Sequence, residues 1–310
     1  MSNTATDLAL SDLEAYRVEL TGYCYRMLGS AFEAEDAVQE TLLRVWRTPY
    51  DADRGPLRPW LYRIATNICV DMLRSVQRRA RPMDLGPAAT PGPSLGAPLP
   101  SSAWVRPAPT ALVCDPAAAV EQRETVRLAF VAALQHLPPR QRAVLILRDV
   151  LRWQADEVAT LLDTSVASVN SAVQRARATL ATRPLPAAPL DADLRELLAR
   201  YVDVFSRYDI PALTALLHED ATTSMPPFQW WLRGRATIAS VLAAAPSTPC
   251  RDAPLVPTSV NGCPAFGQYF ADGSPFALVV LEVSGGLITD MTTHLDLAPA
   301  FPRFGLPACV

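Results

Sequence analysis

Hydrophobic and polar residues follow a helical period over the first eighty positions of the chain. Apolar residues recur at spacings of three and four in two stretches, at Leu13, Tyr16, Leu20 and Tyr23 and then at Ala37, Val38, Leu42 and Val45. The loop TPYDADRGP (48–56) interrupts this pattern, and a third helical stretch begins near Pro59. The pattern predicts an all-helical module over residues 1–82.

The next segment, residues 83–118, has no hydrophobic period and carries a proline about every four residues. A chain of this composition is stiff and extended and buries too little apolar surface to fold alone, so we expect a linker. Helical periodicity resumes at Ala119 and continues to about Thr182, which predicts a second all-helical module over residues 119–183. The proline-containing stretch RPLPAAPLD (183–191) then interrupts the pattern again.

Helices and strands are mixed in the remaining residues, 190–310. Helical patterns cover residues 194–208, 210–218 and 236–244. Strand patterns cover 221–225, 229–233, 254–260, 263–270, 276–283 and 287–295, with Asn261-Gly262 and Gly285-Gly286 as hairpin turns. This order of elements predicts an α+β domain with a curled antiparallel sheet.

Charge is distributed unevenly, although the net charge is only −3. All 28 basic residues are arginine. Residues 1–183 contain 21 Arg and 19 acids, whereas residues 184–310 contain 7 Arg and 12 acids. Six Arg and a single acid, Asp71, lie between Arg58 and Pro82. A local cationic patch of this kind, rather than the total charge, favours binding to a polyanion.

The six cysteines stand far apart, only three histidines occur, and the sequence has no Cys-x-x-Cys pair. We therefore expect no metal site and no cofactor, and we expect free, mostly buried thiols in a reducing cytoplasm. The N-terminus has neither a positively charged flank nor an apolar core, and no apolar run approaches ~18 residues. These patterns predict neither a signal peptide nor a membrane span.

Residues 137–180 contain the clearest motif. Gln154 to Leu161 is predicted to be the first helix of a helix-turn-helix, and Asp163-Thr164-Ser165 the turn and the cap of the second helix. Short polar groups near the start of such a helix suit base edges in the major groove, and the arginines that follow suit phosphates. The spacing also permits an ordinary three-helix bundle with a polar face. The polar side of the second helix comprises Ser165, Ser168, Asn170, Ser171, Gln174, Arg175 and Arg177.

Two stretches of the first module, AEDAVQETLLRVWR (34–47) and RPWLYRIATNICVDMLR (58–74), resemble the second conserved region of bacterial RNA polymerase sigma factors of the small extracytoplasmic-function type. LPPRQRAVLILRDVL (137–151) and SVASVNSAVQRARATL (165–180) resemble the fourth conserved region of the same family. The resemblance covers residues 8–82 and 119–182, in the order of the family. It implies a protein that is not an enzyme and that binds core RNA polymerase and promoter DNA.

The resemblance assigns one face of the helix 33–47 to the polymerase. In the family this face binds the basic clamp helices of the largest subunit, where acids supply charge complementarity and apolar residues anchor the centre. The alternative is a solvated helix whose terminal Trp46 lies in the module's own core. The residues of the predicted contact are Asp36, Gln39, Glu40, Leu43 and Trp46.

The resemblance assigns the basic helix from Arg58 to the minus-ten element, where unpaired, flipped bases must be captured by cations and aromatic rings. Asn67 is the leading candidate for reading a base. The loop 48–57 matches the specificity loop of the family in position only. In the family the linker threads through polymerase channels, although a plain tether remains an alternative. The predicted minus-ten contacts are Trp60, Asn67, Asp71, Arg74, Arg78 and Arg79.

The polar side of the second helix in the helix-turn-helix is implied to bind the minus-thirty-five element. Here Asn170 and Ala172 occupy positions that often carry Lys or Arg in the family. We therefore expect weaker phosphate anchoring and a flatter dependence of affinity on salt at this element.

Residues 190–310 resemble the SnoaL-like polyketide-cyclase branch of the nuclear-transport-factor-like superfamily, a cone-shaped α+β fold with a pocket. PPFQWWLRGRATI (226–238) and ITDMTTHLDLAPAFPRFGLP (288–307) carry this resemblance. Ile288, Asp290, Thr292 and His294 are expected on one face of the last strand, with Asp290 and His294 about 13 Å apart and too distant to pair. The candidate pocket residues are Trp230, Trp231, Asp290 and His294, with Met225 and Tyr269 beside them.

No complete acid–base pair can be placed in this third domain, so we expect a regulatory domain that either senses a ligand, with a small molecule as the candidate, or acts through contacts with the helical modules. The tail after the last strand, with Phe301, Phe304 and Leu306, is expected to fold back on the helical modules. Two other functions are kept as alternatives. One is a helix-turn-helix regulator with a sensor domain, which would bind duplex DNA without polymerase. The other is a cone-fold isomerase-like or cyclase-like enzyme, which would require a titratable base in its pocket.

Overall fold

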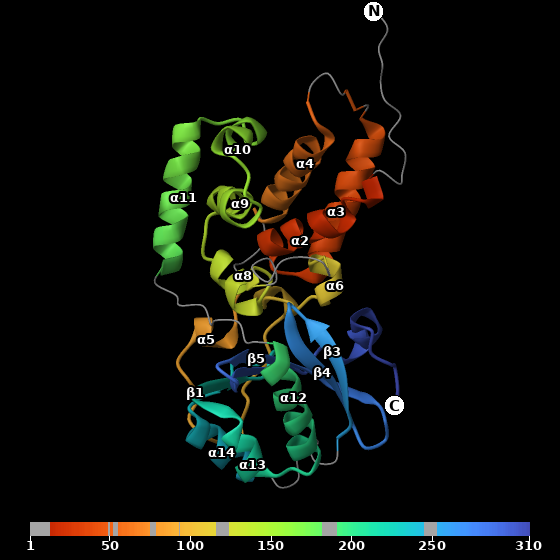
Figure 1. The fold of residues 1–310 in the computed structure, drawn as a ribbon, viewed down its shortest axis with the longest axis vertical. Coiled ribbons are helices and arrows are strands. Elements are labelled where there is room, and N and C mark those ends of the chain that lie inside the picture. The colour runs from red at the N-terminus through yellow and green to blue at the C-terminus, as the bar shows by residue number, and fades with distance from the viewer. Residues whose placement is uncertain are drawn as a thin grey trace, which may run out of the picture. The chain divides into compact units, whose positions relative to one another are not determined.

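The computed structural model describes residues 13–48, 50–51, 55–74, 79–92, 94–115, 124–181, 191–244 and 253–310. The chain divides into two compact units. The first comprises Met1–Arg79 and Val105–Leu185, and the second comprises Ala80–Trp104 and Pro186–Val310. Among the described residues of the first unit the regular elements are all helical, whereas the second unit contains the sheet (Figure 1).

Three helices form the first module of the helical unit: α2 (Arg17–Leu28), α3 (Ala31–Arg47) and α4 (Leu57–Met72). Helix α2 ends at Gly29, whose φ of 72° allows the chain to reverse sharply. Helix α3 begins at once, because the Ser30 hydroxyl accepts a hydrogen bond from the Glu33 amide. The faces predicted to be apolar are buried, and Leu20, Tyr23 and Val38 are each 0% exposed.

The second module follows the predicted helix-turn-helix closely. It contains α8 (Leu128–Leu134), α9 (Pro139–Leu145), a π-helical turn η3 (Ile146–Val150), α10 (Ala155–Leu161) and α11 (Val166–Ala181). Val158 and Val169 are fully buried where α10 and α11 pack together. The short helix α6 (Thr110–Val113) also belongs to this unit.

The described part of the predicted linker is not a free tether. Residues 80–104, with α5 (Pro82–Leu85) and the 3-10 turn η2 (Ser101–Ala103), belong to the α+β unit. The two ends of this segment pair, because the Ala80 amide donates to the Ala103 carbonyl at 2.9 Å and Ala80 bridges Trp104. We call residues 80–104 the docked loop. Its composition prevents independent folding, but a neighbouring domain can supply the contacts that it lacks.

The sheet of the second unit has six strands in the order β2-β1-β6-β5-β4-β3. Its strands are β1 (Leu217–Ser224), β2 (Trp231–Arg233), β3 (Leu255–Val260), β4 (Cys263–Tyr269), β5 (Pro275–Ser284) and β6 (Leu287–His294). The predicted α+β fold is confirmed. The purely antiparallel sheet is wrong, because β1 and β6 run parallel. Parallel neighbouring strands cannot be joined by a tight turn. The elements between β1 and β6 in the chain provide the longer connection that these two strands need.

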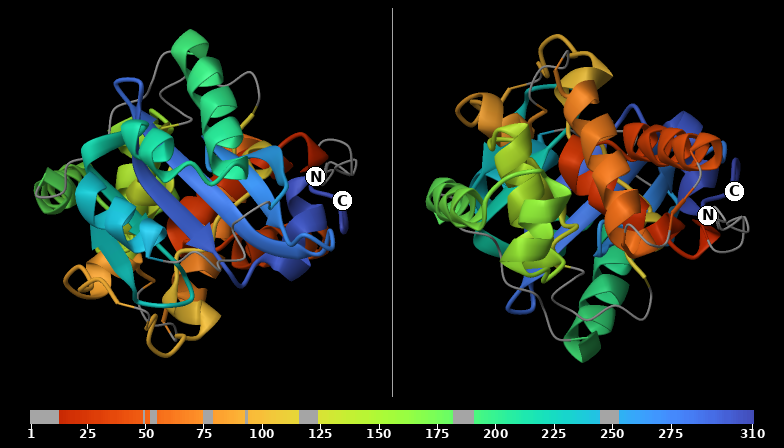
Figure 2. Two further views of the ribbon diagram at one scale, coloured as in Figure 1. Left: turned by 90° about the horizontal axis from the view of Figure 1, so that it is seen from below. Right: turned by 90° about the horizontal axis from the view of Figure 1, so that it is seen from above.

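Helices α12 (Asp191–Ser206), α13 (Ile210–Ala215) and α14 (Arg235–Ala243) share one core with one face of the sheet (Figure 2). Tyr201 stacks on Phe266 with ring centroids 5.5 Å apart, and Met291 of β6 belongs to the same core. The opposite face of β4 is covered by the C-terminal turn η4 (Ala298–Phe304), because a side chain at Gly267 would meet Phe301 and Leu306. The tail residues are thus packed on the sheet of their own unit, which already accounts for their burial.

A β-bulge changes the predicted face of one residue. The β5–β6 register shifts between Glu282 and Val283, so that Asp290 pairs with Glu282 and Ile288 pairs with Val283. The extra residue turns Ile288 into the core with Met291, while Asp290 faces the other way. The prediction that Ile288 and Asp290 share a face is therefore wrong.

Candidate nucleic-acid and protein interfaces

The outer face of α3 carries the residues predicted to bind a large basic partner. Trp46 is 81% exposed and Leu43 is 46% exposed, and Asp36 and Gln39 are also exposed. The alternative that places Trp46 in the core of the module is wrong. We call Asp36, Gln39, Glu40, Leu43 and Trp46 the α3 ridge. An apolar pair of this size in water, flanked by acids, is typical of a protein-binding surface.

The acids of α3 have different environments. Glu40 is half-buried and pairs with Arg44 one turn later, with Oε1 2.8 Å from Nε. Glu33 instead pairs with Arg79, whose side chain is buried. Of these acids, Asp36 and Glu40 therefore contribute to the charge of the ridge, whereas Glu33 has a structural role inside the module.

The burial of Arg79 corrects one sequence prediction. Arg79 was expected to contact a DNA phosphate, but it is 3% exposed and its guanidinium is engaged by the carboxylate of Glu33. Removing one partner of a buried ion pair leaves the other charge uncompensated, so this arginine stabilises the module. Arg78 lies outside the described residues.

The outer face of α4 carries the other predicted minus-ten residues. Asn67, Asp71 and Arg74 are exposed at spacings of four and three, and Asp71 pairs with Arg74 at 3.2 Å. Arg63 is exposed on the same helix, one turn before Asn67. Arg63 was not among the predicted residues, although the same helical spacing, applied back from Asn67, indicates it.

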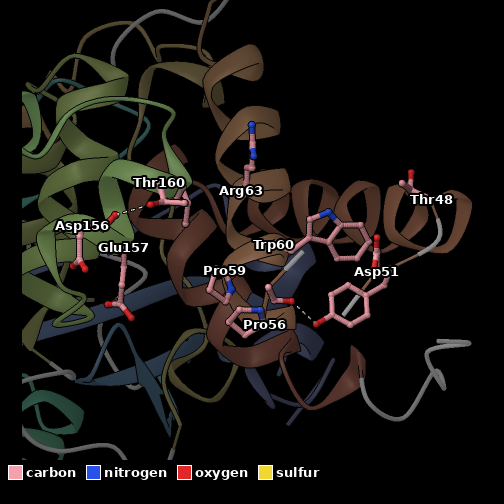
Figure 3. Close-up of a pocket in the computed structure, with 12 residues that line it drawn as sticks. Thr48, Asp51, Pro56, Pro59, Trp60, Arg63, Asp156, Glu157 and Thr160 are labelled. Carbon is pink, nitrogen blue, oxygen red and sulfur yellow. Dashed lines mark hydrogen bonds between the residues drawn. The ribbon is translucent and has the colours of Figure 1, made fainter. Parts of the chain in front are cut away.

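A pocket of about 410 Å³ lies beside the start of α4. Tyr50 and Trp60 form one wall, with ring centroids 5.4 Å apart, and the Tyr50 hydroxyl donates to the Gly55 carbonyl at 2.7 Å. Pro56 and Pro59 extend this wall. Figure 3 shows the pocket, with Asp156, Glu157 and Thr160 of α10 on the side opposite Trp60. The pocket is therefore formed by both helical modules.

All seven polar residues predicted on α11 are exposed. Two of them also have local structural roles. The Ser165 hydroxyl accepts a hydrogen bond from the Ser168 amide at 3.1 Å, and thereby caps the helix. Arg177 makes a two-point ion pair with Asp149, at 2.8 and 2.7 Å, although its side chain remains 64% exposed. A phosphate would have to compete with Asp149 for this guanidinium.

Replacement of Ser165 by alanine should weaken the helix-turn-helix. The loss of an N-cap costs about 1 kcal/mol, because an amide of the first turn loses its partner. We expect a lower midpoint of the helical unit in thermal unfolding followed by circular dichroism. Ser171→Ala, on the exposed face of the same helix, is the control and should leave the midpoint near that of the parent. Equal midpoints for the two variants would show that the cap contributes nothing.

The two helical modules bury an aromatic contact between them. The Arg58 guanidinium lies 5.6 Å from the Tyr62 ring centroid and 5.2 Å from that of Trp153, while Arg58 Nε pairs with Glu19 at 2.6 Å. The rings of Tyr62 and Trp153 are 5.0 Å apart, and Trp153 is only 5% exposed. Cation–π attraction and ring packing both stabilise this cluster, in which the rings of Tyr62 and Trp153 are buried and Arg58 and Glu19 remain partly exposed. We call this cluster, Glu19, Arg58, Tyr62 and Trp153, the module lock.

A second buried contact joins α2 to the segment between α8 and α9. Arg142, 4% exposed, donates to the carbonyls of Met27, Gln135 and Leu137. Burial lowers the pKa of Arg142 to about 10, because the charged form loses water. The three carbonyls take the place of that water. If the modules separated, the hydrogen bond from Arg142 to Met27 would break and both groups would have to bind water instead.

The candidate pocket residues of the α+β unit are not brought together. Trp230 lies in the helix-facing core, whereas Asp290 faces the other side of the sheet, as strand alternation from Met291 requires. His294 is 2% exposed on the same side as Asp290. Trp231 instead donates through Nε1 to the Gly86 carbonyl of the docked loop at 3.0 Å. The prediction that these four residues line one pocket is wrong, because Trp230 lies on the helix-facing side of the sheet, Asp290 and His294 lie on the other side, and Trp231 is bonded to Gly86.

Asp290 is buried in a hydroxyl cluster. The hydroxyls of Thr222 and Thr292 donate to its two carboxylate oxygens, the latter at 2.7 Å. Burial raises the pKa of Asp290, and these hydrogen bonds and the charge of Arg81 only partly oppose the shift. Thr222 lies beside Asp290 in the parallel β1–β6 register, which explains how the cluster assembles.

Asp290→Asn should stabilise the protein at neutral pH and lose this advantage in acid. A carboxyl whose pKa is raised on folding binds protons more tightly in the folded state, so its ionisation penalty is present above the folded pKa and disappears as pH falls toward 3.8. We expect the difference in unfolding midpoint between variant and parent to shrink between pH 7 and pH 4. A difference independent of pH would contradict the assignment. Thr293→Val, elsewhere on β6, is a control without charge.

The described residues contain no cluster of three or more His, Cys, Asp or Glu side chains suited to a metal ion. Of the cysteines that the structure describes, Cys24, Cys69, Cys114 and Cys263 are buried as free thiols and Cys309 is exposed. Across the same residues, every helix is too short or too polar to cross a bilayer.

The two helical modules match known protein families. They match the models of Sigma-70 region 2, over residues 13–79, and Sigma-70 region 4, over residues 127–180. The chain is similar to the ECF RNA polymerase sigma factor SigG of Mycobacterium tuberculosis, with 45% identity over 308 residues that cover 95% of this chain and 82% of that protein. SigJ of the same organism is 32% identical over 218 residues, or 69% of this chain and 64% of that protein.

The likeness in fold extends beyond the helical modules. The crystal structure of the Mycobacterium tuberculosis extracytoplasmic function sigma factor SigJ superposes with a TM-score of 0.65, at 24% sequence identity, and covers 97% of this chain and 100% of that one. The α+β unit is therefore part of the fold that the two chains share, because the match covers 97% of this chain.

Proposed function

Because the chain belongs to the extracytoplasmic-function RNA polymerase sigma factors, we propose that its α3 ridge binds core polymerase, α4 the minus-ten element and α11 the minus-thirty-five element. Sigma factors direct promoter-specific initiation and are not enzymes. The observation that carries the proposal is the exposure of Trp46, at 81%, within an acidic helix face. A side chain of this size gains from burial only if a partner covers it.

The electrostatics of α4 support its assignment to single-stranded DNA. Arg63 and Asn67 are exposed on α4, Arg74 is exposed just after its end, and Trp60 packs with Tyr50 at its start. Cations that follow the backbone beside a stacking platform are what an unpaired strand requires. On α11, the exposed Asn170, Ser171 and Gln174 offer hydrogen bonds to base edges, as a recognition helix needs.

Transcription from a genomic promoter library tests the proposal. Purified core polymerase is incubated with the library with and without the full-length protein, and transcript starts are sequenced. We expect new start sites that share two upstream elements and that disappear for the variant with Asp36, Glu40 and Trp46 all replaced by alanine. Duplex binding without any polymerase-dependent start sites would favour the alternative of a simple helix-turn-helix regulator.

For the α+β unit we propose a regulatory role in which it holds the docked loop. The amides of Ala89 and Leu99 donate to the carbonyls of Trp231 and Pro227, each at 2.8 Å. Ala89 and Leu95 pack on the core of the unit. These contacts, with the Trp231–Gly86 hydrogen bond, support a domain that works by contact rather than by turnover. The close packing of Tyr201, Phe205 and Phe266 in its core also favours this role over that of a small-molecule receptor.

The docked loop, when extended, is long enough to span most of the distance between the two promoter elements. Minus-ten and minus-thirty-five elements are about 25 base pairs apart, roughly 85 Å at 3.4 Å per base pair. Residues 80–104 could extend over roughly 80 Å at about 3.3 Å per residue. When docked, the two ends of the loop are instead joined by the Ala80–Ala103 hydrogen bond. We infer that the loop must leave the α+β unit before the modules can occupy both elements.

Hydrogen exchange of the loop amides tests this role. In the full-length protein, the Ala89 and Leu99 amides should be protected, and polymerase with promoter DNA should abolish that protection. Trp231→Ala should accelerate exchange at both amides by at least tenfold in the free protein, whereas Trp231→Phe, which keeps a smaller aromatic ring and loses the Nε1 donor to Gly86, should have a smaller effect. Protection that persists in the promoter complex would refute the role.

A further inference from the structure

The residues that α11 buries define the face that it turns outward. Its core side comprises Val169, Ala172, Val173 and Ala176. The side chains on the far side recur at spacings of three and four, and each of them is exposed. We call these residues the reading stripe: Ala167, Asn170, Ser171 and Gln174.

Other polar side chains of α11 and its cap are held by contacts within the protein. The hydroxyls of Ser165 and Ser168 lie 2.9 Å apart, and Ser165 also caps the helix. Arg177 is held by Asp149 through two hydrogen bonds, at 2.8 and 2.7 Å. A base would have to compete with these partners. The reading stripe is therefore the part of the helix best placed for base contacts.

The first half of this helix carries no guanidinium. Residues 166–174, all of which the structure describes, contain no charged side chain, and the first arginine of the helix is Arg175. A recognition helix contacts base edges mainly with residues near its N-terminus, and guanine is most often read there by two hydrogen bonds from Arg or Lys. The part of α11 that reads bases therefore lacks the group that most often selects guanine.

The two amides of the reading stripe match adenine better than guanine. Asn170 and Gln174 each present an NH₂ donor and a carbonyl acceptor. In the major groove adenine offers an acceptor at N7 and a donor at N6, so both halves of the amide find a partner. Guanine offers two acceptors, which would leave the amide carbonyl without a hydrogen bond. Ala167 presents only a methyl group, which suits the C5 methyl of thymine.

The spacing of the amides predicts how far apart the two adenines lie. Asn170 and Gln174 are four positions apart, or about 6 Å along the axis at about 1.5 Å per residue. Base pairs are stacked about 3.4 Å apart. The amides therefore reach two base pairs that are about two steps apart. Ala167 is three positions before Asn170, so its methyl group faces a neighbouring pair.

From the reading stripe we propose that α11 selects A·T pairs in the minus-thirty-five element: Asn170 and Gln174 each read an adenine, and Ala167 packs on a thymine methyl. The proposal rests on the assignment of α11 to that element, made above, and adds the base that each residue recognises. Arg175 then contributes affinity through phosphates and not base preference.

Selection from a promoter library tests this reading. Six base pairs of the upstream element of a promoter found in the transcription test are randomised, and holoenzyme containing the full-length protein selects bound duplexes for sequencing. We expect two adenine preferences about two steps apart, each at least about fivefold over guanine. Gln174→Arg should convert one of them to a guanine preference, and Asn170→Ala should abolish the other. The control Arg175→Ala should weaken binding to all sequences by a similar factor and leave the preferences unchanged.

Uracil substitution tests the thymine contact without changing the protein. Replacing each thymine of the upstream element in turn by uracil removes one methyl group, and at one position this should weaken binding about threefold. Uracil in the DNA between the two promoter elements is the control and should have no effect. Equal affinity for all thymine and uracil duplexes would refute the role of Ala167.

The outcomes separate this inference from the proposed function. If the selected element has no adenine preference, yet its preferences change with Asn170→Ala and Gln174→Arg, α11 reads the element and the adenine reading is refuted. If the randomised positions show no preference while polymerase-dependent initiation persists, the assignment of α11 to the minus-thirty-five element fails as well. Adenine preferences that both variants leave unchanged would also refute the reading, because another part of the protein would then supply them.

Discussion

Trp46→Ala should reduce the affinity of the protein for core polymerase by at least about 30-fold, or about 2 kcal/mol. Trp46 is 81% exposed at the end of α3, and in the free protein most of its apolar surface faces water. Aromatic residues at the centre of an interface account for a large share of binding energy, because they bury much area with few rotamers to lose. The dissociation constant can be measured by fluorescence anisotropy of labelled protein titrated with core polymerase.

Because Trp46 packs so little on its own module, its loss should leave folding unchanged, and the unfolding midpoint checks this directly. Val18→Ala is a matched control, since Val18 is an exposed apolar residue, at 39%, on the neighbouring helix α2. It should bind polymerase as the parent does. Asp36→Asn should act differently from Trp46→Ala and mainly slow association, because a charge at the rim steers encounter. Unchanged affinity for Trp46→Ala would remove the α3 ridge from the polymerase interface.

Trp153→Ala should open the module lock, with a loss of about 3 kcal/mol or more in the packing between the helical modules. The substitution removes the ring that packs on Tyr62 at 5.0 Å and on the Arg58 guanidinium at 5.2 Å. The modules should then separate in a larger fraction of molecules. Hydrogen exchange should report this opening as faster exchange at the Arg106 amide, which lies in the segment leading to the second module and donates to the Gly29 carbonyl of the first at 2.8 Å.

The cavity left by Trp153→Ala could also destabilise the second module as a whole. A control substitution at an equally buried position of that module separates this effect from the opening of the module lock. Val169→Ala on α11 is suitable, because Val169 is fully buried and α11 packs on α9 and α10. It should lower the unfolding midpoint of the module without accelerating exchange at Arg106. If both variants accelerate that exchange equally, Trp153 stabilises only its own module.

The elements of the structure were largely predictable from short-range patterns. The period of three and four placed α2, α3 and α4, and Ser165 was identified as a cap because its side chain acts within one turn. The strands of the α+β unit were found within a few residues of their observed bounds, since turn residues such as Asn261-Gly262 mark their ends. Exposure of the polar side of α11 also follows from helical spacing, whereas spacing left open whether Trp46 of the α3 ridge lies in the core or in solvent.

Several features of the sites were not predictable. Arg79 belongs to a run of arginines that suggests a phosphate track, yet Glu33, 46 positions earlier in the chain, engages it within the module. The docked loop has the composition of a tether, but its backbone pairs with Trp231 and Pro227, more than 100 positions away in the chain. A single bulge between β5 and β6 moved Ile288 away from the face of Asp290.

The sequence by itself determined the family, the helices and strands, and the outward faces of α3, α4 and α11, because these depend on residue type and on spacing within a few turns. Only the tertiary structure decided that Arg79 is buried, that the proline-rich segment docks on the α+β unit, and that α10 lies opposite Trp60 across a pocket. Each of these three features depends on contacts between residues that are distant in the chain. The free energy of burying a polar group depends on which partner replaces its water. Local pattern carries no information about that partner.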